Sequence, residues 1–280
     1  MSVILAIDAA WTEGKPSGVA VMVSSGKRWR CAAVAPSYEA FLALSNGVHI
    51  DWTARRFDGS VPEATLLLDA ASRLAGARVD LVTIDMPVAT VPITGRRKAD
   101  ECISKKYGGR GCSTHTPSCA RPGKLGEWLT KQFKAAGYSV ATKAEPTGRT
   151  MRLVEVYPHP ALLTLLEREY RVPYKVAKAH RYWPKSTVMQ RIAALLNEFR
   201  VISEALVRIV GPVALPLPQA DAVPSLAALK RYEDAVDALL CAWVGICYLE
   251  RVAHPFGDET AAIWCPPIEV TGHSVAHEAG

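Results

Sequence analysis

The sequence predicts a single α/β domain built on a mixed β-sheet. Short β-branched runs separated by short loops open the chain, and strand-like and helical segments alternate after them. Consecutive strands with short links form an antiparallel meander, whereas strand–helix alternation produces parallel strands with helices on both faces. The 280 residues, 49% of them hydrophobic, can bury one large core.

The predicted strands follow from apolar runs bounded by turn residues. The meander consists of residues 3–8 (VILAID), 18–24 (GVAVMVS) and 28–35 (RWRCAAVA). Its second link, Ser25-Gly26-Lys27, contains a glycine that accepts hairpin geometry. Further strands are expected at 79–85 (VDLVTID) and 152–158 (RLVEVYP), with an edge strand at 262–267 (AIWCPP).

The helical segments show apolar residues at helical spacing. They are expected at 38–45, 62–76, 124–136, about 186–209 and about 226–252. The segment 93–122 is rich in Gly, Arg, Lys, Ser, Thr and Cys, and we expect an inserted basic loop or lid there. The domain is expected to span residues 1–267, followed by a disordered tail at 268–280.

The composition indicates a cytoplasmic protein without a membrane partner. No apolar run approaches the roughly 20 residues of a membrane span, and the N-terminus shows no export signal. Seven scattered cysteines are typical of reduced thiols rather than of a disulfide framework. The net charge of +6 is too modest to identify a nucleic-acid partner by itself.

Two of the predicted strands end on an aspartate, Asp8 and Asp85. Ligands of open α/β sheets collect at the carboxyl ends of strands, where the loops splay apart. A lone aspartate at such a position can simply cap a turn. Two at matching positions are expected to emerge at the same rim of the sheet and to serve a site.

Three further carboxylates are candidates for the same site. Glu155 lies inside an apolar strand, where it either faces solvent from an edge or points into the cleft. Asp234 and Asp237 share one face of the last predicted helix with apolar residues, although a role at the helix dipole is the alternative. Carboxylates gathered in a partly desolvated cleft repel each other unless a cation neutralises them.

Carboxylate oxygens select hard cations, so Mg²⁺ or Mn²⁺ is the expected cofactor. Two such ions roughly 4 Å apart can activate water and stabilise the leaving oxygen of a phosphodiester. We therefore expect Asp8, Asp85, Glu155, Asp234 and Asp237 to form a catalytic cluster. A nucleic acid is the expected partner, and the sequence leaves a homodimer open.

The order of the acidic motifs resembles a known family. IDAAW at 7–11, IDMP at 84–87, RRKAD at 96–100, EVYPHP at 155–160 and EDAVDAL at 233–239 are similar to the family called domain of unknown function 429. That family is placed among predicted ribonuclease-H-like nucleases, near the Holliday-junction resolvases. The resemblance implies a metal-dependent nuclease with Asp8, Asp85, Asp234 and Asp237 at the metal; Glu155 matches the strand before the basic segment.

Two basic clusters are candidates for phosphate contacts, which position a nucleic acid without reading its sequence. They comprise Arg96, Arg97, Lys98, Lys105, Lys106 and Arg110 in the first cluster, and Lys175, Lys178, Arg181 and Lys185 in the second. A solvated charged face is the alternative for both. Cys102, Cys112, His115 and Cys119 are zinc-type ligands, but they lack the C-x₂₋₄-C spacing of structural zinc sites.

The leading hypothesis is hydrolysis of a nucleic-acid phosphodiester by metal-activated water. One alternative is an ATP-binding enzyme of the related actin-like and sugar-kinase fold, although residues 9–18 form a poor phosphate loop. The other is a non-catalytic module of the same fold that binds nucleic acid or protein.

Overall fold

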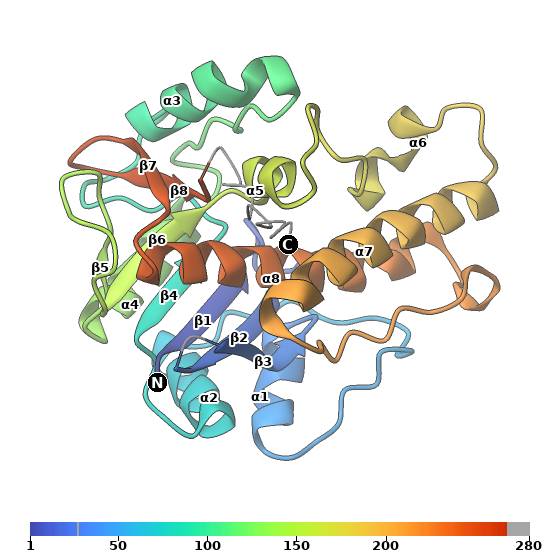
Figure 1. Cartoon of the computed structure of the whole chain (residues 1–280), viewed down its shortest axis with the longest axis horizontal. Helices are drawn as coiled ribbons and strands as arrows, with labels where there is room; N and C mark the ends of the chain where they lie inside the picture. The colour runs from blue at the N-terminus through green and yellow to red at the C-terminus, as the bar shows by residue number, and fades with distance from the viewer. Residues whose placement is uncertain (27, 268–280) are drawn as a thin grey trace, which may run out of the picture.

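A mixed eight-stranded sheet forms the centre of the protein in our computed structural model, which describes residues 1–26 and 28–267 (Figure 1). The strands are β1 (Val3–Asp8), β2 (Gly18–Ser25), β3 (Arg28–Ala35), β4 (Leu81–Ile84), β5 (Ser139–Val140), β6 (Arg152–Val156), β7 (His254–Gly257) and β8 (Ala262–Cys265). Their order is β3-β2-β1-β4-β6-β8-β7, and β5 also pairs with β6. The first three strands form the antiparallel meander, and β1, β4, β6 and β8 run parallel.

This arrangement confirms the predicted fold class. The prediction for residues 262–267 was wrong in one respect: β8 is a strand, but it lies between β6 and β7 rather than at the edge. The edge strand β7 reads HPFG, which is too short and too proline-interrupted to show a strand pattern. The strand β5 has only two residues, so its sequence shows no strand pattern either.

Helices cover both faces of the sheet (Figure 1). One face packs against α5 (Pro158–Leu165), α7 (Val188–Val210) and α8 (Lys230–Leu249), and the other against α1 (Tyr38–Ser45), α2 (Ala64–Ala75) and α4 (Lys124–Ala135). Ile4 and Ala6 of β1 join the first layer, whereas Leu5 and Ile7 join the second. This alternation follows from the two-residue period of a strand. No helix in the described part of the chain has the length and apolar character needed to cross a bilayer.

The predicted lid at 93–122 is partly helical, which corrects the expectation of a loop. It contains α3 (Lys98–Tyr107), which packs against β7 and β8, and a 3₁₀ turn at Gly108–Arg110. Ala99, Ile103 and Tyr107 recur every four residues and are buried, so the helical period exists beneath the surrounding charges. A short helix of four residues, α6 (Ala179–Tyr182), precedes α7. The predicted tail at 268–280 lies outside the described residues.

The helix α8 approaches the meander so closely that one position admits only glycine. A Cβ atom at Gly18, the first residue of β2, would lie 2.0 Å from the backbone oxygen of Asp234. Because backbone atoms cannot rotate away as a side chain can, a larger residue there must displace α8 from the sheet. The position of the acidic turns of α8 thus depends on Gly18.

We predict that Gly18→Ala lowers the free energy of unfolding by about 2 kcal/mol or more. Gly14→Ala is the matched control, since a Cβ at Gly14 meets no atom within 4 Å. Urea unfolding of both variants measures the difference. Equal stability of the two variants would show that α8 does not press on β2 in this way.

Candidate functional site

A cleft of about 1640 Å³ opens at the carboxyl ends of the parallel strands, beside the first turns of α8. Asp8, Asp85, Glu155 and Asp234 line it. Asp237 is fully buried one helical turn beyond Asp234. The structure therefore brings the strand-end and helix carboxylates into one region.

Asp8 and Asp85 reach the cleft from adjacent parallel strands. Asp8 is the last residue of β1, and Asp85 directly follows β4. The backbone N–H of Asp85 donates to the carbonyl of Ile7 at 2.9 Å, so the β1–β4 pairing continues up to the rim. Regular parallel pairing thus places both carboxylates side by side without a dedicated loop.

The carboxylates of α8 are paired with two lysines. Lys230 contacts Asp234 Oδ1 and lies 3.0 Å from Glu233 Oε1, while Lys175 contacts Asp237 Oδ2 and lies 3.4 Å from Glu233 Oε1. The Tyr174 hydroxyl donates to Asp237 Oδ1 at 2.6 Å. Asp234 Oδ2 is buried and has no hydrogen-bond partner among the described residues.

Burial and mutual repulsion favour the protonated state of several of these groups. Burial first, and then repulsion from Asp237 and Asp234, raises the pKa of Asp8 well above its ordinary value. Burial raises the pKa of Asp85 to about 7, although Lys175 opposes the shift. Burial raises the pKa of Asp234 to about 6 against the opposing charge of Lys230. Burial therefore works against the charged forms of Asp8, Asp85 and Asp234, and the two lysines offset this only in part.

The donor chemistry suits a hard cation, although the carboxylates do not converge on one point. Asp8, Asp85 and Asp234 Oδ2 offer oxygen atoms of the kind that Mg²⁺ and Mn²⁺ prefer. Within residues 1–26 and 28–267, however, no three such side chains stand close enough together to hold a metal ion. Both oxygens of Asp237 are already used by Tyr174 and Lys175.

Glu155 occupies a buried ion pair instead of a free position in the cleft. Arg97 donates to both of its oxygens at 2.6 Å, and the backbone N–H of Val88 donates to Oε2 at 3.0 Å. Arg97 also pairs with Asp100 at 3.0 Å and donates to the carbonyl of Val88. These bonds join β6, the segment after β4 and the start of α3, so Glu155 has a structural role there, and its catalytic role stays a prediction.

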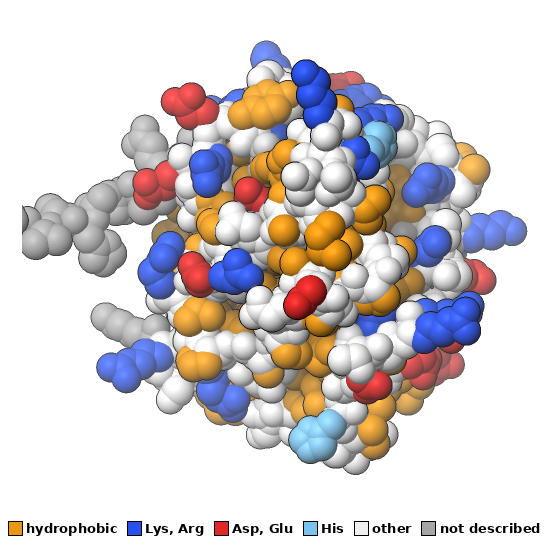
Figure 2. All heavy atoms as spheres, turned by 90° about the vertical axis from the view of Figure 1, so that its right-hand side faces the viewer, with side chains coloured by type: hydrophobic (Ala, Val, Ile, Leu, Met, Phe, Trp, Pro, Cys, Tyr) orange, Lys and Arg blue, Asp and Glu red, His pale blue; other side chains and the backbone are white. Residues whose placement is uncertain are grey.

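Only some of the basic residues predicted to contact phosphate lie at the cleft. Lys175 and Lys178 line the cleft, whereas Arg96, Arg97, Lys98, Lys105, Lys106 and Arg110 do not. Arg110 donates to the carbonyls of Glu169 and Arg168, and Lys98 pairs with Glu101 at 3.2 Å on the exposed side of α3. Of the first basic cluster, Arg96, Arg97 and Arg110 thus connect α3 and the residues beside it to other segments. Figure 2 shows Lys and Arg side chains spread among acidic and hydrophobic ones on the face that lies at the right-hand side of Figure 1.

The zinc-type residues do not assemble into a site. Cys112 is buried, whereas Cys119 is exposed and lies 4.0 Å from the carbonyl of Ile93. All the cysteines of the described chain are free thiols.

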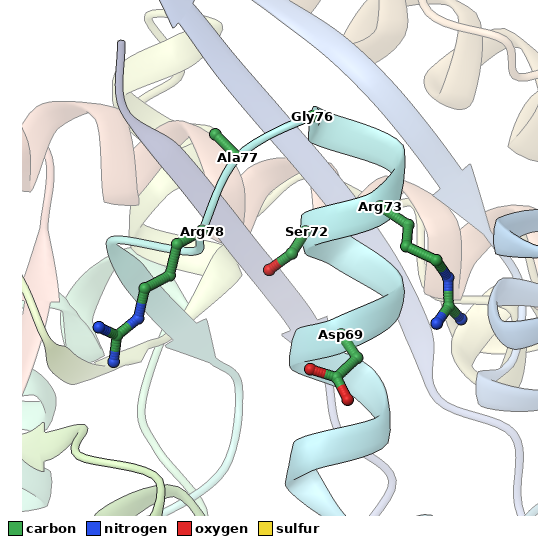
Figure 3. A pocket seen from close by; sticks show the side chains of 6 residues that line it. All are labelled: Asp69, Ser72, Arg73, Gly76, Ala77 and Arg78. Carbon is green, nitrogen blue, oxygen red and sulfur yellow. The ribbon is translucent and has the colours of Figure 1, made fainter.

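A second hollow, of about 500 Å³, lies at the end of α2 and is lined by Asp69, Ser72, Arg73, Gly76, Ala77 and Arg78 (Figure 3). It contains none of the predicted site residues.

Sequence reasoning missed Glu233, Lys230 and Tyr174 as members of the cluster. One signal was available, because Lys230 stands three and four residues before Glu233 and Asp234 and so shares their helical face. Tyr174 approaches from a distant loop, and nothing in the local sequence indicates its contact with Asp237.

The sheet order, with an antiparallel meander followed by parallel strands under helices on both faces, defines a mixed α/β fold consistent with the ribonuclease-H-like class. The family model described as Protein of unknown function (DUF429) matches residues 7–261, and the chain belongs to this family. Neither the comparison with curated proteins nor that with solved structures gives a match.

The buried pair of Arg97 and Glu155, with side chains 8% and 4% exposed, provides a test of its structural role. Arg97→Met leaves the Glu155 carboxylate buried without its ionic partner and should destabilise the protein by roughly 3 kcal/mol, whereas Glu155→Gln leaves Arg97 paired with Asp100 and should cost less. The double variant should lose clearly less than the sum, as measured by urea unfolding. The exposed pair of Lys98 and Glu101 is the control, where the same cycle should show no measurable coupling. Additive losses at Arg97 and Glu155 would contradict the pairing.

The raised pKa of Asp85 predicts a stability effect with a definite sign. The folded protein keeps a proton up to about pH 7 that the unfolded chain releases near pH 4. Stability contributed by this group is therefore present below about pH 4 and is lost as the pH rises through about 7. With chelator present, Asp85→Asn should be more stable than the wild type by about 1–3 kcal/mol near pH 8.

The difference should shrink as the pH is lowered, which thermal unfolding at several pH values will show. Asp69→Asn is the control, because Asp69 is exposed on α2 and remote from the cleft. A wild type more stable than Asp85→Asn near pH 8 would mean that the Asp85 carboxylate is well solvated or better paired than its burial indicates.

Proposed function

We propose that the protein is a metal-dependent hydrolase of phosphodiester bonds in a nucleic acid. One observation carries the proposal: Asp8 and Asp85 leave adjacent parallel strands and line the same cleft as Asp234. Three carboxylates gathered in a partly desolvated cleft are costly without a compensating cation. Such a cost is maintained at sites where the charge has a use.

The proposed ligands are Asp8, Asp85 and Asp234, whose side chains have to move toward one another to share an ion, and the proposed ion is Mg²⁺ or Mn²⁺. A bound ion of this kind supplies a Lewis acid and lowers the pKa of water. Asp237 is better described as a positioning residue, because its carboxylate holds Lys175 and Tyr174 in place. Lys230 neutralises Asp234 and lines the cleft, where a substrate phosphate can also meet its charge.

Several features of the cleft support a nucleic acid as the substrate. It is large enough for several nucleotides, and Lys15, Arg55, Arg56, Arg121, Arg171 and Lys178 line it along with the carboxylates. The aromatic side chains of Trp11, Trp52 and Tyr157 also line it. Cationic groups interleaved with aromatic rings are the usual means of holding single-stranded nucleic acid.

A non-catalytic binding module is the second candidate, and a specific observation favours it. Lys175 and Lys230 already neutralise part of the acidic cluster without any metal. If these pairs persist when substrate is bound, the same cleft binds nucleic acid through its other cations but does not cleave it.

We predict that Asp8→Asn abolishes Mn²⁺-dependent cleavage. The loss should be roughly 100-fold or more, since a ligand of the ion contributes several kcal/mol to transition-state stabilisation. Single-turnover assays on single-stranded, duplex, hybrid and branched substrates measure the rate. Asp69→Asn makes the same change of charge at a remote, exposed position and should retain the wild-type rate.

Thermal unfolding with and without Mn²⁺ gives a readout independent of cleavage. Mn²⁺ should stabilise the wild type and the Asp69→Asn variant, and it should stabilise Asp8→Asn less. Identical behaviour of the wild type and Asp8→Asn in both measurements would leave the binding module as the better description.

A further inference from the structure

We propose that one wall of the cleft, formed by His115, Arg121, Arg171 and Lys178, is a binding site for a phosphate group of the substrate. We call these four residues the cationic wall. For the chemical class of the ligand we rely on the proposed function, but binding at the wall requires neither a metal nor cleavage.

The cationic wall is assembled from distant parts of the chain. His115 and Arg121 belong to the segment between α3 and α4, Arg171 to the segment after α5, and Lys178 to the 3₁₀ turn Val176–Lys178. All four line the cleft that also contains Asp8 and Asp85. Three cations and one titratable histidine from separate segments indicate a site rather than an extended charged face.

The cationic wall has no ionic partner in the part of the chain that the structure describes. Lys175, Lys230 and Arg97 each pair with carboxylates, whereas none of the four wall residues forms a salt bridge. The charges that lower the pKa of His115 all come from cations, namely Lys178, Arg171 and Arg121. A ligand with negative charge would compensate the wall.

Two of the wall residues, His115 and Lys178, have lowered pKa values. Partial burial first, and then repulsion from Lys178 and Arg171, lowers the pKa of His115. Partial burial and then repulsion from Arg171 and Lys175 lowers the pKa of Lys178. An anion placed between these groups removes the repulsion and favours their charged forms.

Arg171 is held in a fixed position and still has an unused donor. Its Nη1 donates to the carbonyl of Gly111 at 3.2 Å, and its Nη2 contacts His159 Nε2. Burial and the neighbouring cations lower the pKa of His159 well below its ordinary value, so the ring is neutral and Nε2 accepts. The proton then resides on Nδ1. Neither His159 Nδ1 nor Arg171 Nε has a hydrogen-bond acceptor among the described residues.

A phosphate suits this wall better than the carboxylate of an acidic peptide. It offers several acceptor oxygens, and arginine binds it through parallel hydrogen bonds. An aromatic ring stands beside the wall, since the Arg121 guanidinium lies over the Trp11 ring at 5.9 Å and Trp11 lines the cleft. A nucleotide can therefore place its phosphate on the wall while its base stacks nearby.

The test compares Lys178→Ala with Arg181→Ala in the presence of EDTA. Arg181 is exposed, acts electrostatically on Lys178 and does not line the cleft. The Arg181→Ala variant therefore removes a nearby positive charge that lies outside the site. Calorimetry with inorganic phosphate and anisotropy with a short single-stranded oligonucleotide measure affinity. Lys178→Ala should bind both probes roughly tenfold more weakly, and Arg181→Ala should bind like the wild type.

The oligonucleotide is used with a 5′-phosphate and with a 5′-hydroxyl group. A loss confined to the phosphorylated strand assigns the wall to a terminal phosphate, and an equal loss on both assigns it to a bridging phosphodiester. Equal affinities of Lys178→Ala and Arg181→Ala for every probe would overturn the proposal. So would competition by an acidic peptide as effective as that by the oligonucleotide.

The titration of His115, followed by NMR, is a second measurement that does not depend on Lys178→Ala folding normally. Inorganic phosphate should raise the pKa of His115, whose signal is assigned with His115→Gln. An unchanged pKa at saturating phosphate would contradict the site. Asp8→Asn should keep its phosphate affinity, so failed cleavage with intact binding overturns only the hydrolase, and cleavage without binding at the wall overturns only this site.

Discussion

The burial of acidic residues of α8 against the carboxyl ends of β1 and β4 is the constraint on which the rest of the site depends. Asp234 and Asp237 are 2% and 0% exposed, and a carboxylate at such depth requires a partner. Lys175 and Lys230 provide that partner, and Lys175 thereby ties the segment before α6, which lines the cleft, to α8. Gly18 permits the approach of α8. The geometry of the cleft therefore follows from how these charges are compensated.

The compensation is incomplete, and the deficit lies on the side of the strand ends. The lysines satisfy Asp237 and one oxygen of Asp234, but the pKa of Asp85 remains raised to about 7. A core stabilised only for folding gains nothing from such a group, because an apolar residue of similar size costs less to bury. The charged forms of Asp8 and Asp85 therefore reduce stability near neutral pH.

The sequence predicted the fold better than it predicted the contacts of the site. Strand and helix periods identify β1 to β4, β6 and the long helices, because burial on a sheet imposes those periods directly. Asp8 and Asp85 were found by the same logic, since each ends an apolar run. Arg97 and Glu155 could not be recognised as partners, because 58 residues separate them and their pairing depends on how α3 packs. The sequence shows that a residue is charged, but only the fold shows whether its side chain is already paired with another charged residue.

That distinction separates two kinds of cation in this protein. The first kind, represented by Arg97 and Lys175, has carboxylate partners within the fold and serves to hold segments together. The second kind, represented by Arg171 and Lys178, faces the cleft with other cations and has no carboxylate partner in the described chain. A net charge of +6 does not reveal this division. The cleft therefore combines acidic groups at the strand ends with basic groups that lack a carboxylate partner in the described chain, and the second set is the part of its field that suits a ligand with negative charge.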